Sequence, residues 1–117
     1  MTTIKIVLAV LFLDILFFTA WHPKKMLAGG AVEEETKLLF NSKCASCHGI
    51  DGSANTAIGR ELKAKDLRSP QTQKMSDDKL YDVIAKGRDK MPAFEQRLGG
   101  DKCRQLVPYI RQLARKQ

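Results

Sequence analysis

Two cysteines separated by two residues, with a histidine directly after the second, lie near the middle of the chain. The run is Cys44-Ala45-Ser46-Cys47-His48, and this C-x-x-C-H pattern is the attachment signature of c-type haem. The spacing has a chemical reason, because two thiols on one turn can each add to one of the two vinyl groups of the macrocycle. The adjacent imidazole then reaches the iron from one side. The run therefore predicts one covalent haem c, attached at Cys44 and Cys47 and ligated by His48.

Other kinds of site use the same residue types. A zinc site needs four ligands, whereas only Cys44, Cys47 and His48 cluster here, with Cys103 and His22 far away in the sequence. A thioredoxin-like dithiol is expected in a βαβ setting, which the sequence does not indicate, and a structural disulfide would leave His48 unexplained. Haem is the favoured interpretation, with zinc and a reactive dithiol as the alternatives.

The part of the chain that can form a domain is short. Residues 6–21 are apolar except for Asp14 and Thr19. The segment of residues 33–117 is of a size that buries only about 60% of its unfolded surface. Such a domain commonly gains stability from a disulfide, a metal or a cofactor. We therefore expect the macrocycle to be the packing partner of the long loops as well.

Residues 1–28 are interpreted as a signal peptide or an N-terminal membrane anchor, and residues 29–117 as the domain. Small residues at 28–31 suit cleavage but lie rather far from the apolar stretch. As an anchor, residues 6–21 fall slightly short of the ~17–25 residues that span a bilayer. Asp14 would add about 2.5–3.5 kcal/mol on insertion. Both interpretations imply export, to the periplasm or to the outer face of the cytoplasmic membrane.

Helix signals recur along the domain, and no stretch alternates with period two, so an all-α fold of three main helices and a shorter one is predicted. Residues 29–30, both glycine, are expected to form a hinge. The first helix then opens with the three acidic residues 33–35, which suit the positive end of its dipole, and runs into Cys44. Residues 49–59 are rich in Gly, Ser, Asn and Thr and are interpreted as a loop.

Later helices are marked by their caps. Ser69, followed by Pro70, and Ser76 are typical N-caps, and Gly87 is expected to end the helix that Ser76 begins. Gly99 precedes the last helix, whose buried side is expected to carry four residues at helical spacing: Cys103, Leu106, Ile110 and Leu113.

The second axial position of a haem iron takes a sulfur or nitrogen donor, and Met75 and Met91 are the candidates. Met75 directly precedes Ser76, where a core-filling role is natural. Met91 follows Gly87 in a loop, and Pro92 biases its backbone towards an extended form that fixes the side-chain direction. We expect Met91 as the ligand, with Met75 or an open position as the alternatives. A Met/His pair raises the reduction potential of the haem.

Further residues share a known pattern with this run: Phe40 four positions before Cys44, Gly49 after His48, the run Lys90-Met91-Pro92-Ala93-Phe94, and Leu106-x-x-Tyr109-Ile110-Arg111. On these residues the chain resembles the class I, mono-haem cytochromes c of the small exported or membrane-anchored bacterial type, over about residues 33–115. The resemblance implies that the first and last helices cross at near right angles. Phe40 and the Tyr109-Ile110 pair would pack at the crossing. It also implies a role in electron transfer.

In that family a proline carbonyl in the loop commonly accepts a hydrogen bond from the haem-ligating histidine. The loop between His48 and Leu62 contains no proline. The carbonyls of Ala57 and Ile58 are candidates for this role, and the sequence does not assign the partner of His48.

Three other positions lead to expectations about packing. Thr36 lies where the family often has a smaller residue at the helix crossing. Pro108 lies inside the last helix, where it should remove one backbone hydrogen bond and cost about 3 kcal/mol unless a kink accommodates it. Cys103 shares a face with Leu106, so we expect it to be a small buried hydrophobe rather than a reactive thiol.

The formal net charge is +7, but the basic residues are scattered and nucleic acid is not an expected partner. Four basic residues flank the two haem-binding loops and predict docking to an acidic redox protein: Lys43, Lys86, Arg88 and Lys90. The expected function is that of a one-electron carrier, not an enzyme, with no small-molecule substrate and with possible membrane attachment through residues 6–21. The alternatives are a fixed haem subunit of a larger oxidoreductase complex and a haem sensor with an open sixth position.

Overall fold

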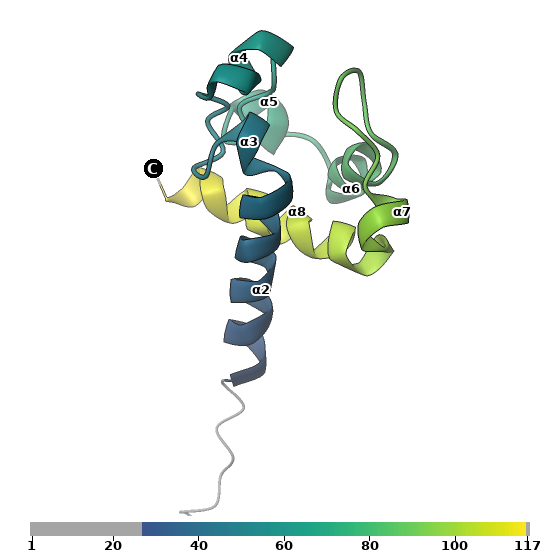
Figure 1. Ribbon diagram of the computed structural model, residues 1–117. Coiled ribbons are helices and arrows are strands. Elements are labelled where there is room, and N and C mark those ends of the chain that lie inside the picture. The colour runs from purple at the N-terminus through teal and green to yellow at the C-terminus, as the bar shows by residue number, and fades with distance from the viewer. Residues whose placement is uncertain (1–26, 117) are drawn as a thin grey trace, which may run out of the picture.

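The computed structural model describes residues 27–116, and these residues form helices joined by loops (Figure 1). The longer helices are α2 (Leu27–Lys43), α6 (Asp77–Lys86) and α8 (Gly100–Arg115). The short ones are α3 (Ala45–His48), α4 (Ala57–Leu62), α5 (Pro70–Gln73) and α7 (Glu95–Leu98). No strand is present within this part of the chain, where one isolated β-bridge pairs Arg88 with Met91. The all-α class is confirmed, with several one-turn helices where a single shorter helix was expected.

Helix α2 begins earlier than the sequence predicts. It starts at Leu27 and runs through Gly29 and Gly30, so the expected hinge at these glycines and the expected start at Glu33 are wrong. Its first half extends away from the body of the domain (Figure 1). The interpretation of residues 1–26 as part of a signal or anchor lies outside the described residues. Within residues 27–116, no helix has the length and apolar character needed to cross a membrane.

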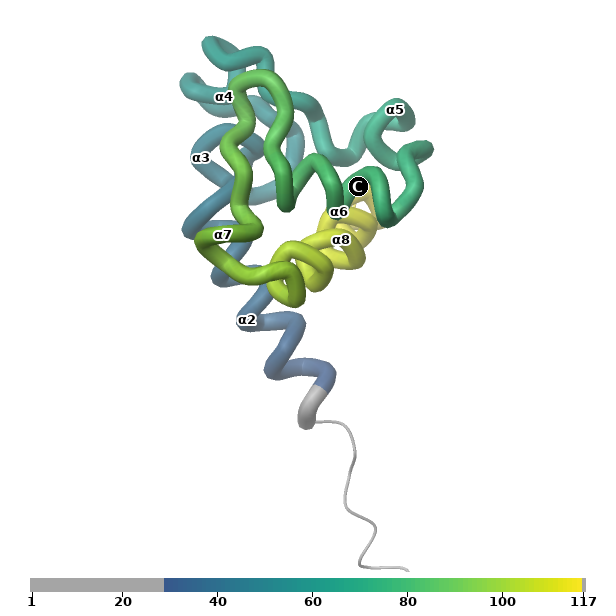
Figure 2. The backbone as a smooth tube through the Cα atoms, turned by 90° about the vertical axis from the view of Figure 1, so that its right-hand side faces the viewer, coloured from purple at the N-terminus to yellow at the C-terminus, as the bar shows by residue number. Residues whose placement is uncertain are grey.

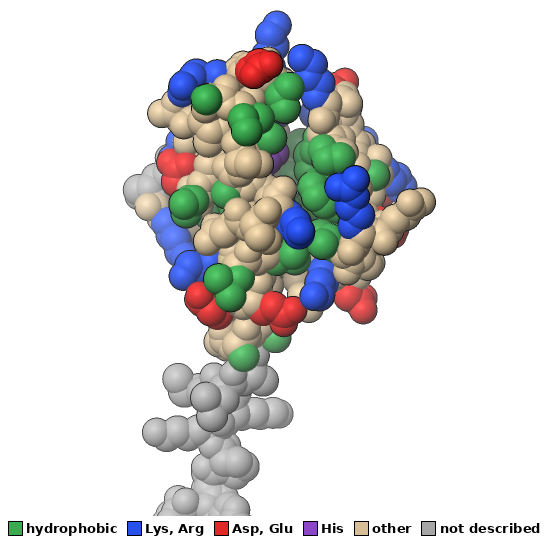
Figure 3. All heavy atoms as spheres, viewed as in Figure 1, with side chains coloured by type: hydrophobic (Ala, Val, Ile, Leu, Met, Phe, Trp, Pro, Cys, Tyr) green, Lys and Arg blue, Asp and Glu red, His purple; other side chains and the backbone are tan. Residues whose placement is uncertain are grey.

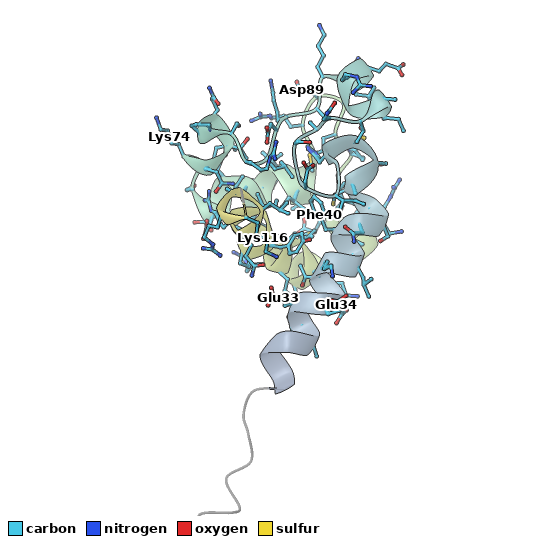
Figure 4. All side chains as sticks on the ribbon, turned by 90° about the vertical axis from the view of Figure 1, so that its left-hand side faces the viewer. Glu33, Glu34, Phe40, Lys74, Asp89 and Lys116 are labelled. Carbon is cyan, nitrogen blue, oxygen red and sulfur yellow. The ribbon has the colours of Figure 1, made fainter. Side chains whose placement is uncertain are left out.

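The domain is organised around the crossing of α2 and α8, as the family resemblance implies. Phe40 is 1% exposed, and its ring centroid lies 5.1 Å from that of Tyr109. Phe40 lies between the two helices in Figure 4. One turn earlier, the buried Thr36 donates its hydroxyl to the Val32 carbonyl at 2.7 Å. Threonine is therefore accommodated at the crossing without an unpaired polar group.

Helix α8 buries the face that the sequence predicts: Cys103, Leu106, Ile110 and Leu113, together with Val107 and Tyr109. Cys103 is 0% exposed, which confirms its interpretation as a buried hydrophobe. Pro108 is exposed on the other side, and the helix continues through it to Arg115. The carbonyl that Pro108 leaves without a donor belongs to Arg104, also an exposed residue, so water can satisfy it.

The predicted caps are confirmed. The Ser69 hydroxyl accepts a hydrogen bond from the backbone N–H of Thr72 and starts α5, and the Ser76 hydroxyl accepts one from Lys79 and starts α6. Gly87 ends α6 with φ of 74°. A side chain at this position would be strained and would meet the Met91 carbonyl at 2.6 Å.

Helix α4 lies in backbone contact with α3, and the predicted loop over residues 49–59 therefore ends earlier, at Thr56. The Thr56 hydroxyl accepts a hydrogen bond from the Gly59 N–H at 2.8 Å, and it donates to the Ser46 carbonyl at 2.8 Å. A Cβ at Gly59 would overlap the carbonyl oxygen of Cys47. Glycine at this position lets α4 approach the cysteine segment.

Replacing Phe40 with Ala should remove most of the contact between α2 and α8. We expect a loss of about 3–5 kcal/mol in the free energy of unfolding, since the ring is fully enclosed. Urea unfolding followed by circular dichroism measures this loss. Leu38→Ala is the matched control, because Leu38 lies on the same helix and is 60% exposed, and its loss should stay within about 0.5 kcal/mol. Equal losses in the two variants would contradict this packing of Phe40.

Replacing Gly59 with Ala should push α4 away from the cysteine segment, because the new Cβ would overlap backbone atoms. We expect a clear loss of unfolding free energy by the same measurement. Gly30→Ala is the control, since nothing lies within 4 Å of the Cβ it would add. That variant should gain about 0.5–1 kcal/mol from helix propensity. A gain in both variants would show that α4 tolerates displacement.

Candidate functional site

The cysteine segment continues directly from α2. The N–H of Cys44 donates to the Phe40 carbonyl at 2.8 Å, and the N–H groups of Cys47 and His48 donate to the Cys44 carbonyl at 3.2 and 2.9 Å. Cys44, Cys47 and His48 therefore lie on a single turn, the two cysteines partly exposed and His48 9% exposed. Gly49, with φ of 77°, ends this turn. The structure thus brings together the three residues that the motif predicts.

The His48 ring is held by a backbone carbonyl. Its Nδ1 lies 2.9 Å from the carbonyl oxygen of Lys65. Because a carbonyl only accepts, Nδ1 carries the proton and Nε2 keeps a free lone pair. Neither of the two candidates from the sequence, Ala57 and Ile58, supplies this carbonyl. Both residues lie in α4, where carbonyls face along the helix axis.

Burial also controls the ionisation of His48. It lowers the pKa of the imidazole below its usual value, and the hydrogen bond to Lys65 opposes this shift. The neutral ring is the form that coordinates a metal. At neutral pH, His48 is therefore a suitable axial donor for an iron through Nε2.

The cysteines are free thiols in the structure. Burial, with smaller contributions from the neighbouring Cys103 and Cys47, raises the pKa of Cys44 to about 11. Cys44 therefore stays protonated at neutral pH in the absence of a metal. Within residues 27–116, no group of three His, Cys, Asp or Glu side chains could hold a metal ion. This part of the chain also contains no βαβ unit.

Met91 lies at the end of a tight turn. Its N–H donates to the Arg88 carbonyl at 2.9 Å, and its carbonyl accepts from the Arg88 N–H at 3.1 Å. Asp89, at the tip, has φ of 53°. The N–H of Phe94 donates to the Ile84 carbonyl at 3.1 Å and ties the far end of the loop to α6. The backbone of Met91 is therefore fixed on both sides, and its side chain packs partly buried against the core.

Met75 is also partly buried against the core. Its backbone, however, is bound to α8, because Arg111 donates from Nη2 to the Met75 carbonyl at 2.6 Å. The same guanidinium forms a 2.7 Å ion pair with Asp77. Met75 thus belongs to the junction between α5 and α6.

A hollow opens between the two predicted haem-binding segments. In Figure 1, α3 and α4 lie on one side and the loop that carries Met91 lies on the other. Figure 2 shows, from a right angle, this loop running beside the same helices. In the space-filling view the surface between them is hollowed, and hydrophobic side chains and a histidine are visible inside (Figure 3). Within residues 27–116 the only histidine is His48.

These features fit a c-type haem. The two thiols needed for attachment lie one turn apart, next to a histidine with a free Nε2 lone pair. The hollow between the loops offers apolar side chains to a flat macrocycle. Sequence reasoning missed Lys65, which acts through its backbone carbonyl. It also missed Gly59 and Thr56, the N-cap of α4. Thr56 is a typical N-cap residue and could have been found by that signal, whereas Lys65 and Gly59 have no local signature.

Comparisons with known proteins point the same way. The family model described as "Cytochrome C oxidase, cbb3-type, subunit III" matches residues 31–110. Cytochrome c6 of Leptolyngbya boryana is 30% identical over 81 residues, which cover 67% of this chain and 88% of that protein. A solved structure, the KustC0563 c-type cytochrome, has a TM-score of 0.61 and 30% identity, covering 67% of this chain and 95% of that one.

A longer relative is the cbb3-type cytochrome c oxidase subunit CcoP of Azospirillum brasilense. It is 30% identical over 91 residues, which cover 76% of this chain. The match spans only 31% of the length of that subunit. Taken together with the fold and the cysteine segment, these matches establish that the chain belongs to the class I cytochrome c family, whose mono-haem members carry one covalently bound haem c.

Proposed function

We propose that the domain carries one electron at a time between redox proteins, with the haem iron held between His48 and Met91. The observation that carries this proposal is the 2.9 Å hydrogen bond from His48 to the Lys65 carbonyl, because it leaves Nε2 ready to ligate. When bound, the haem supplies an iron that alternates between its ferric and ferrous forms. The chain itself attaches, ligates and encloses the macrocycle.

Cys44 and Cys47 would provide the two thiols through which the haem is attached. Each thiol would add across one vinyl group of the haem, forming a carbon–sulfur bond and giving its hydrogen to the other vinyl carbon. The addition would need no oxidant, and both cysteines are free thiols. The two thioethers would hold the macrocycle edge beside the turn that carries Cys44 and Cys47.

Met91 is the proposed second ligand because its loop lies across the hollow from α3 (Figure 1). The turn from Arg88 and the anchoring of Phe94 fix the course of that loop. A methionine opposite a histidine closes both axial positions and raises the reduction potential. Such an iron exchanges electrons without binding a substrate, which supports a carrier rather than a catalyst.

The docking surface is proposed to surround the two haem-binding loops. All four basic residues expected there are exposed: Lys43, Lys86, Arg88 and Lys90. Lys86 pairs with Asp82 at 2.7 Å, and Arg88 lies 3.8 Å from Asp89. Lys43 and Lys90 have no acidic partner within salt-bridge distance among residues 27–116. Of the four basic residues, these two therefore have positive charges that no neighbouring carboxylate offsets. Ile50 and Ile58, 71% and 47% exposed, add apolar contact area beside the cysteine segment.

A second candidate function is a fixed haem subunit of a larger oxidoreductase. The similarity to the oxidase subunit CcoP favours it, and residues 6–21 would then tether the domain. In both functions the domain would work on the extracytoplasmic side of the membrane, in the periplasm or attached to its outer face. Purification of the native protein separates the two, since a carrier is recovered alone and a subunit is recovered in fixed stoichiometry with partners.

Replacing Met91 with Ala should open the sixth position. The reduced variant should bind carbon monoxide at neutral pH and show the absorbance change of a ligated haem, whereas the unchanged protein should not. Met75→Ala is the matched control and should behave like the unchanged protein. Carbon monoxide binding by the unchanged protein would instead favour a haem sensor with an open position.

Replacing both Lys43 and Lys90 with Gln should slow electron transfer to an acidic redox protein. We expect the bimolecular rate constant to fall at low ionic strength and to depend less steeply on salt, because the Debye length is about 10 Å at 0.1 M. Stopped-flow kinetics over a salt series measures both effects. Lys74→Gln is the control, since Lys74 projects from the side away from α2 (Figure 4). Rates that do not depend on salt would contradict the docking surface.

A further inference from the structure

The carbonyl that orients His48 belongs to the segment of residues 64–67, in which only Leu67 is buried in the core. Lys65 is exposed and follows α4, and its neighbours are fixed by backbone hydrogen bonds. Before it, the N–H of Ala64 donates to the Gly59 carbonyl at 2.8 Å, and after it the N–H of Leu67 donates to the Gly52 carbonyl at 2.8 Å. These two bonds set the position of the segment relative to α4 and to the loop after His48.

A third bond connects the segment to the other side of the molecule. The side-chain amide of Gln73, the last residue of α5, donates from Nε2 to the Leu67 carbonyl at 2.7 Å. The same nitrogen lies 3.3 Å from the Ile110 carbonyl in α8. Arg111 of α8 in turn donates to the Gln73 carbonyl at 2.8 Å. One amide group therefore joins the Lys65 segment to α8, the helix that organises the core.

We propose that Gln73 is a positioning residue for His48, because it holds Leu67 against α8 and thereby keeps the Lys65 carbonyl on Nδ1 of His48. This inference rests on the proposed ligation of the haem iron by His48. A hydrogen bond at Nδ1 makes Nε2 a stronger donor, which stabilises the ferric form relative to the ferrous form. Gln73 thus helps to set the reduction potential without touching the haem ligand.

The neighbouring contacts show why Gln73 carries this role rather than the other polar residues nearby. The carbonyl of Asp66 accepts hydrogen bonds from the hydroxyls of both Ser69 and Thr72, at 2.8 and 3.0 Å. Loss of either hydroxyl leaves the other in place. For the Leu67 carbonyl, Gln73 is the one donor found among the described residues. Removing its amide therefore takes away the hydrogen bond that links the Leu67 carbonyl to α8, while the Leu67 side chain stays in the core.

The test compares Gln73→Met and Gln73→Glu with Gln71→Met in the full haem-loaded chain. Met and Glu keep the length of the side chain but cannot donate, and Glu can still pair with Arg111. Gln71 lies in the same short helix and is exposed, so Gln71→Met controls for the loss of an amide on α5. Two quantities are measured: the reduction potential, and the exchange rate of the His48 Nδ1 proton by NMR in the reduced protein.

Both Gln73 variants should have a higher reduction potential than the unchanged protein. Their Nδ1 proton should exchange roughly fivefold faster, as expected from the loss of one ordinary hydrogen bond. Gln71→Met should change neither quantity. The backbone amides of α2 should keep their protection in all three variants, since the effect is local. General loss of that protection in both Gln73 variants would overturn the proposal in favour of a merely structural role.

The remaining outcomes separate this inference from the function on which it rests. If the His48 resonances show the ring-current shift of a haem ligand but neither Gln73 variant alters Nδ1 exchange or potential, the inference on Gln73 alone is overturned. If the unchanged protein lacks that shift, ligation by His48 is wrong and both proposals fail. A change in Gln71→Met as large as in Gln73→Met would also overturn the role of Gln73.

Discussion

The contact between the rings of Phe40 and Tyr109 holds α2 against α8, and the site is positioned from this crossing. The N–H of Cys44 bonds to the carbonyl of Phe40 itself, so the first thiol is fixed to the residue at the crossing. On the other helix, Ile110 and Arg111 follow Tyr109 directly and hold Gln73. The turn that carries His48 and the segment that orients its ring are therefore both linked to the packed crossing of α2 and α8.

Hydrogen bonds from short polar side chains help to order the loops around the site. Thr56 joins α4 to the cysteine segment, and Ser69 and Thr72 satisfy the carbonyl of Asp66. Each of these bonds runs from a short polar side chain to a nearby backbone group, an arrangement that suits turns. A chain too short for a large core can keep long loops ordered in this way, and the macrocycle adds the apolar surface that these loops lack.

Local signals in the sequence predicted local structure well. The helix ends predicted at Ser69, Ser76 and Gly87 are present in the structure. The buried face of α8 follows from the helical spacing of its apolar residues. The start of α2 was predicted wrongly, because the helical cost of two glycines is small enough to be offset. The role of the Lys65 carbonyl could not be predicted from the sequence, for a different reason. Every residue has a carbonyl, and only the path of the chain after α4 brings this one to His48. Which methionine ligates the iron stays a prediction, based on the loop that carries Met91.

The complete burial of Cys103 bears on how the protein is assembled. With Cys44 and Cys47 in the thioethers proposed above, Cys103 would be the remaining thiol of this sequence, and its side chain is 0% exposed. In an oxidising compartment an accessible odd thiol forms mixed disulfides and covalent dimers. The Cys103 sulfur lies on the buried side of α8, where it is shielded from such reactions. The order of events then matters, because an unfolded chain exposes all three thiols and is protected only after haem attachment and folding are complete.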